Sequence, residues 1–182
     1  MEINMNYWRI YALKENTYEI SAKEEEFEKL FPYIFEGESV IDKWDSSLEL
    51  YFKKGSIHDS DVFLFDEDYF IINSKAKKIF DMKTNGELEY LNFNCESGDL
   101  IIAYPIKTID CIDMEKSKYR VYKGDKSRIQ KFEKLYLDKA KIGESNLFRM
   151  KHIELGYIFC SDVLKNELEE KQIKGLGFTL ID

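Results

Sequence analysis

The feature that most constrains the fold is a run of short strand patterns from residue 87 onward, with few helical patterns among them. Aromatic and β-branched residues recur in "LEYLNFN", "LIIAYPIKTIDCI" and "KYRVYK", and turn residues separate these segments. "NLFRMKHI", "GYIFCS" and "GLGFTLI" add further strands, and the near-alternate spacing in the ambiguous "RIQKFEKLYLD" favours a strand as well. Regular βαβ alternation is absent. The sequence therefore predicts an α+β fold, with a largely antiparallel sheet and a few packed helices.

Strand and helical patterns also precede that run. The strand patterns cover residues 7–13, 47–54, 62–65 and 69–72. The first helical pattern, "SAKEEEFEKLF", has Ser21 or a residue near it as its cap and ends at Pro32. The second covers residues 75–82, with Ser74 as its N-cap. Its apolar face is formed by Ala76, Ile79 and Phe80.

A third helical pattern, residues 161–171, lies near the end of the chain. Ser161 is its expected N-cap, and Glu167 stands four residues before Lys171, the spacing of a supporting ion pair. The residues expected to face inward are Val163, Leu164 and Leu168. A turn at Asn85-Gly86 marks a soft boundary. We expect an N-terminal α+β subdomain (residues 1–85) and a strand-rich C-terminal subdomain (residues 86–182), packed as one compact unit.

The net charge and the cysteine content indicate which kind of partner the protein binds and in which cellular compartment it works. The 182 residues carry a formal net charge of −8, which disfavours nucleic-acid binding and favours a basic protein partner. Cys95, Cys111 and Cys160 are scattered without a C-x-x-C pair, as in a protein of a reducing compartment. No signal peptide and no apolar run long enough to span a membrane are present. We therefore expect a cytoplasmic protein that does not bind membranes.

Residues with the spacing of a catalytic or cofactor site are not found. The two histidines, His58 and His152, lack spaced partners for a triad or a zinc site. Gly175 and Gly177 precede a strand rather than a helix, so they are interpreted as turn and close-packing residues and not as a phosphate cradle. The sequence predicts no cofactor, no metal and no catalytic residue.

Acidic clusters are the candidate sites for a partner. "DSDVFLFDEDY" carries five carboxylates without an intervening cation, and a second cluster follows Lys23. Either could meet a basic protein. Tyr33, Phe35, Trp44 and Tyr69 are the aromatic residues most expected at the surface. The predicted partner-binding residues are Asp59, Asp61, Asp66, Glu67, Asp68, Tyr69, Glu24, Glu25 and Glu26.

Several segments resemble a family of bacterial immunity proteins from polymorphic toxin systems, whose members end in F-x-S-D-x-L-K followed by G-L-x-F. The resemblance covers about residues 58–182. The matching positions near the end are Leu147, Phe148, Arg149, Met150, Ser161, Asp162, Leu164, Lys165, Ile173, Gly175, Leu176 and Phe178. Asp113 and Ser117 match a further D-x-x-x-S segment, and "SDVFLFDEDYFIINSKAKKIF" resembles the family's strand and helix start.

The resemblance implies a cytoplasmic antidote that binds and blocks a cognate toxin, without catalytic residues of its own. Such toxins are often enzymes, and those that are nucleases are basic. Two alternatives stay open at the level of sequence. One is a regulatory or adaptor module that binds another protein, and the other is a metal-dependent enzyme using the carboxylates between Asp59 and Asp68.

Overall fold

The computed structural model describes residues 5–13, 20–22, 26, 39–52, 60–65, 69–96, 99–124, 126, 129–151 and 157–181. The helices within this part of the chain are α2 (Ser74–Lys83), α3 (Lys139–Ile142) and α4 (Asp162–Glu170). The strands are β1 (Tyr7–Ala12), β2 (Ile20–Ala22), β3 (Leu50–Phe52), β4 (Val62–Phe65), β5 (Tyr69–Ile72), β6 (Leu88–Leu91), β7 (Ile101–Pro105), β8 (Thr108–Ile109), β9 (Lys118–Val121), β10 (Ile129–Lys134), β11 (Leu147–Met150), β12 (Ile158–Ser161) and β13 (Leu176–Ile181).

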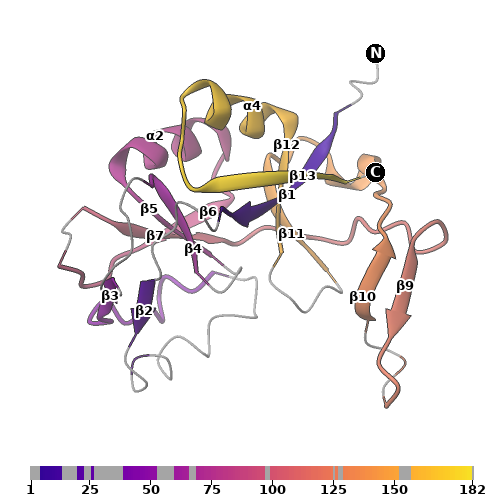
Figure 1. The fold of residues 1–182 in the computed structure, drawn as a ribbon, viewed down its shortest axis with the longest axis horizontal. Helices are drawn as coiled ribbons and strands as arrows, with labels where there is room; N and C mark the ends of the chain where they lie inside the picture. Colours follow the sequence, from indigo (N-terminus) through magenta and orange to yellow (C-terminus); the bar gives the residue numbers. More distant parts are fainter. Residues whose placement is uncertain are drawn as a thin grey trace.

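Two larger sheets form the body of the molecule. One has five strands in the order β13-β1-β12-β11-β8, and the other has four in the order β4-β5-β7-β6. Neighbouring strands in both are antiparallel, except that β8 runs parallel to β11. The helices α2 and α4 contact each other and lie along one side of the body (Figure 1). The predicted α+β fold with a largely antiparallel sheet is confirmed.

Three apolar clusters hold these layers together. The first joins both helices to both sheets and includes Ile10, Phe80 and Leu164. Strand β5 is buried on both faces: Phe70 faces this first cluster, and Ile71 faces a second on the opposite side of the four-stranded sheet. The third includes Phe148 together with Ile109, Ile112 and Ile142. The alternation of each strand's side chains thus sets which core it fills.

Helix caps follow the sequence prediction at one helix and differ at the other. At α4 the Ser161 hydroxyl accepts a hydrogen bond from the Leu164 amide, as predicted. Leu164 and Leu168 are buried, but Val163 is 43% exposed, so its expected inward position was wrong. At α2 the cap is Asn73, one residue before the predicted Ser74, since its side chain accepts from the Ala76 amide.

Other local predictions divide in the same way. Within the ambiguous segment, residues 129–134 form a strand, β10, and α2 buries Ala76, Ile79 and Phe80 as expected. Ser21 lies in β2 opposite Tyr51, so it does not cap a helix, and most of the helix predicted after it lies outside the described residues. The short helix α3 was not predicted.

The chain crosses the predicted boundary at residue 85 in both large sheets. β1 pairs with β12 and β13, and β5 pairs with β7. The division into two subdomains stays a prediction. None of the helices that the structure describes is long and apolar enough to cross a membrane.

Candidate functional site

The predicted acidic surface is only partly visible in the structure. Six of its nine residues lie outside the described part of the chain: Glu24, Glu25, Asp59, Asp66, Glu67 and Asp68. The other three, Glu26, Asp61 and Tyr69, each expose at most 9% of their surface. A contact between this surface and a partner therefore stays a prediction. The three described residues are buried inside the folded protein.

Asp61 holds three segments together at one point, which we call the Asp61 joint. Its carboxylate accepts hydrogen bonds from Asn73 Nδ2 (2.8 Å), Lys75 Nζ (2.9 Å) and the Lys174 amide (3.0 Å). Its own amide donates to the Lys174 carbonyl. Burial alone would raise the pKa of Asp61, but these hydrogen bonds outweigh it and lower the pKa below its ordinary value. This carboxylate is charged and satisfied by the chain itself.

Gly175 completes the Asp61 joint. Its φ is +106°, and a Cβ at this position would lie 2.0 Å from the Val62 carbonyl oxygen. The backbone of the segment before β13 can therefore approach the start of β4 only where no side chain intervenes. At Gly177 a Cβ would meet the Tyr11 ring at 2.5 Å. The interpretation of these two glycines as turn and close-packing residues is confirmed.

Tyr69 and Glu26 also lie inside the fold. Tyr69 is 3% exposed in the second apolar cluster, so its expected surface position was wrong. Glu26 accepts a hydrogen bond from the Glu49 amide at 3.1 Å. Trp44 is half-buried and donates its Nε1 proton to the Asn92 carbonyl. Tyr33 and Phe35, expected at the surface, lie outside the described residues.

Sequence reasoning missed a buried polar junction around Glu87. Its carboxylate accepts from the Ser145 hydroxyl and from the Leu147 amide (2.9 Å), and burial still raises its pKa. Asn146 extends the junction by donating to the Lys83 carbonyl and accepting from the Ser161 hydroxyl. These bonds join the end of α2 to the starts of β11 and α4. The partners lie about sixty residues apart, so no local pattern marks them.

The described residues contain neither a metal-binding cluster nor a buried thiol with a lowered pKa. Among them, no group of three or more His, Cys, Asp or Glu side chains is arranged to hold a metal ion. Burial raises the pKa of the Cys111 thiol to about 12, and it also raises the pKa of Cys160. A protonated thiol is a poor nucleophile at neutral pH. His58 and His152 lie outside the described residues.

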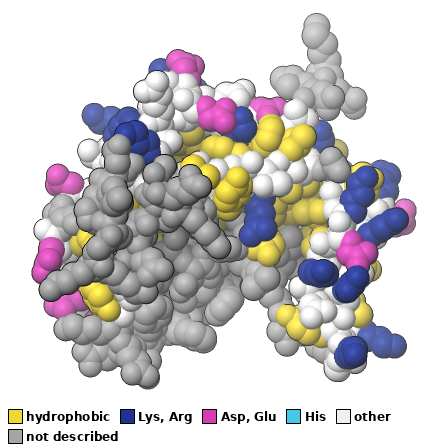
Figure 2. All heavy atoms as spheres, in the orientation of Figure 1, with side chains coloured by type: hydrophobic (Ala, Val, Ile, Leu, Met, Phe, Trp, Pro, Cys, Tyr) yellow, Lys and Arg dark blue, Asp and Glu magenta, His cyan; other side chains and the backbone are white. Residues whose placement is uncertain are grey.

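The most distinctive described surface is one that the sequence prediction did not select. Strands β9 and β10 form an antiparallel hairpin that extends from one end of the body (Figure 1). Figure 2 shows Lys and Arg side chains gathered along it. We call residues 116–134 the basic hairpin. They include eight Lys or Arg and two acids, a net charge of +6, in a chain whose total is −8. The remaining residues therefore carry −14. This asymmetry was readable from sequence.

Fold and site together define an α+β protein in which the described buried carboxylates serve the structure and a charged surface stays exposed. A family model described as "Immunity protein family (Imm11)" matches residues 11–182, so the chain belongs to this family. The suspected resemblance to bacterial immunity proteins is thus confirmed. The motif residues Phe148 and Arg149 are buried in β11, and Ser161 caps α4, so these positions maintain the fold. None of the curated proteins compared with the chain matches it.

Proposed function

We propose that this protein is the antidote to one cognate bacterial toxin, which it binds and neutralises as a stoichiometric complex in the cytoplasm of the producing cell. The observation that carries the proposal is the match of the immunity-family model to residues 11–182. That range contains all the described helices and nearly all of the described strands. Membership of the family implies that the protein binds a toxin. The proposal adds that one molecule of this protein neutralises one molecule of that toxin.

Binding rather than catalysis fits the described chemistry. The carboxylates of Asp61 and Glu87 are engaged by the chain's own donors, and the thiols of Cys111 and Cys160 are buried. Inhibition by complex formation requires a complementary surface of about 800 Å² on each partner and no reactive group. If the toxin is a basic nuclease, the net charge of −8 will also speed the first encounter.

The test is a titration of toxin activity with the purified protein, using the toxin domain encoded beside its gene. We expect the activity to fall linearly and to reach zero near one equivalent, and the two proteins to co-elute as a complex. A noncognate toxin of the same activity serves as the control and should be unaffected. Full activity at excess antidote would refute the proposal. So would loss of activity at a few hundredths of an equivalent, because that indicates turnover.

A further inference from the structure

The basic hairpin is held firmly at its base and exposed beyond it. The Asp113 amide donates to the Tyr136 carbonyl, and the Tyr136 amide donates to the Ser117 hydroxyl at 3.0 Å. Phe132 and Leu135 pack against the third apolar cluster. Beyond this base, β9 and β10 form a separate two-stranded sheet within the described part of the chain. The anchorage fixes the direction in which the hairpin extends.

Four of the hairpin's described cations have no carboxylate partner among the described residues. Arg120 pairs with Glu133 at 2.5 Å, and Lys116 pairs with Asp113 at 2.8 Å. No carboxylate of the described residues pairs with the exposed cations Lys118, Lys123, Lys126 and Lys131. An isolated two-stranded hairpin is only marginally stable. Repulsion among these unpaired cations therefore lowers the stability of the hairpin.

The strand register places like charges opposite each other. Arg120 is the cross-strand partner of Lys131, and Lys118 is the partner of Lys134. Like charges at directly opposed positions destabilise an antiparallel pair. In the free protein these two pairs oppose formation of the hairpin. A negatively charged partner seated on the strands would convert both pairs into favourable contacts.

Aromatic side chains stand among these cations. Tyr119 and Tyr122 are 39% and 40% exposed, and the Tyr119 ring lies 5.8 Å from that of Phe132 on the facing strand. Tyrosine and arginine are enriched among the residues that contribute most to protein interfaces. The hairpin therefore combines an aromatic centre with a cationic rim.

We propose that the basic hairpin is the arm with which this protein docks into an acidic recess on its toxin. The inference rests on the proposed function and names its contact surface. A protein partner is favoured over nucleic acid, because the rest of the chain carries −14 and would repel a phosphate backbone that ran beyond the hairpin. A compact acidic recess meets only the hairpin and avoids that repulsion.

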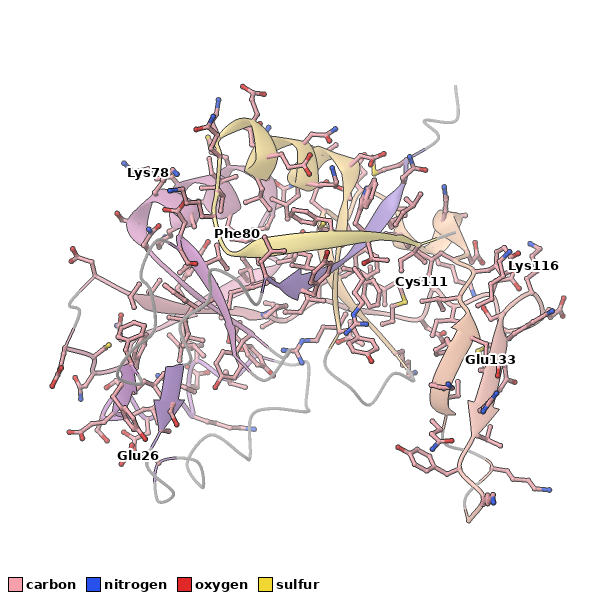
Figure 3. The ribbon with its side chains drawn as sticks, in the orientation of Figure 1. Glu26, Lys78, Phe80, Cys111, Lys116 and Glu133 are labelled. Carbon is pink, nitrogen blue, oxygen red and sulfur yellow. The ribbon has the colours of Figure 1, made fainter. Side chains whose placement is uncertain are left out.

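The decisive variant is Lys123→Glu combined with Lys131→Glu. Lys131→Glu places a carboxylate opposite Arg120, an attractive cross-strand pair, so the hairpin should stay formed. We expect the Kd for the toxin to rise at least tenfold, with a slower association rate at low salt. The conservative Lys123→Arg and Lys131→Arg pair should bind like the wild type. Lys78→Glu on α2, far from the hairpin, should change Kd less than twofold (Figure 3).

The outcomes separate the two proposals. If the wild-type protein does not bind the toxin, the proposed function itself fails. If the wild type binds and the double variant binds equally well, only the docking arm is overturned. The same proteins are titrated with fluorescent single-stranded and duplex DNA and RNA at 150 mM salt. Nucleic-acid binding that the double variant loses, together with unchanged toxin binding, would overturn the docking arm and assign the hairpin to nucleic acid.

Discussion

The Asp61 joint and the basic hairpin are both rich in charge, and they use it in opposite ways. At the joint, one carboxylate is buried and satisfied by Asn73, Lys75 and the Lys174 amide. At the hairpin, several cations are exposed, and two pairs of them face each other across the strands. Charge at the joint stabilises the fold, whereas the like-charge pairs across the hairpin oppose it. A charged surface that lowers the stability of the fold is therefore a better candidate for a functional site than a charged group that raises it.

Glycine substitutions should give the largest contrast between the two regions. At Gly175, alanine places a Cβ 2.0 Å from the Val62 carbonyl oxygen at a φ of +106°, so β4 and the segment before β13 must separate. We expect Gly175→Ala to lower the free energy of unfolding by about 3 kcal/mol or more. The measurement is urea denaturation followed by tryptophan fluorescence.

The matched control is Gly124→Ala in the basic hairpin. A Cβ there meets no atom of the described residues within 4 Å, and its φ lies outside the positive range. Its effect should stay within about 0.5 kcal/mol, the usual range for a surface substitution. Equal effects at the two glycines would contradict the view that only the Asp61 joint requires the close backbone approach.

A carboxylate comparison should give an intermediate effect. Asp61→Asn removes a buried charge that accepts three hydrogen bonds, and we expect it to lower the free energy of unfolding by about 2 kcal/mol at pH 7. Lys75 is half-exposed, so solvent screening limits the loss. Glu133→Gln in the hairpin removes an exposed ion pair with Arg120 and should cost less than about 0.5 kcal/mol.

The cost of Asp61→Asn should also depend on pH in a defined direction. The pKa of Asp61 is lowered in the folded state, so its contribution is complete above the ordinary aspartate pKa and is lost as the pH falls through the folded-state value. Stability curves of both proteins should therefore converge below about pH 4. A difference that stays constant from pH 7 to pH 3 would show that shape, and not charge, is what Asp61 supplies.

The two regions also show what a sequence reveals locally and what it hides. Alternation predicted β10, and the Ser161 cap and the buried positions of Leu164 and Leu168 in α4 were readable within ten residues. Asp61 looked like one member of a solvated acidic run because its partner Lys174 stands 113 residues away. Tyr69 was wrongly predicted to be exposed for a related reason. Strand β5 is buried on both faces, and this depends on packing between segments that are distant in the sequence.

The basic hairpin was missed for a different reason. Its charge was visible in the sequence, but net charge of the whole chain masked a local excess of opposite sign. The register that sets Arg120 opposite Lys131 was not readable, because two irregularities in the β9–β10 pairing shift the strands. The net charge calculated over short windows of the sequence would have revealed this basic segment. Its proposed role in binding rests on the strand register, which only the structure shows.

The smallest expected effect is a gain. Lys118→Glu replaces the like-charge pair with Lys134 by an opposite one, and we expect it to stabilise the hairpin by about 0.5 kcal/mol. Native-state hydrogen exchange of the Tyr119 and Phe132 amides measures this locally, and 1 M salt should abolish most of the gain. Lys78→Glu, on the exposed face of α2, should leave these amides unchanged. If the Lys118→Glu variant exchanges more slowly but binds the toxin more weakly, the stability of the hairpin and its role in binding are separate properties. If it exchanges more slowly and binds equally well, Lys118 does not belong to the interface.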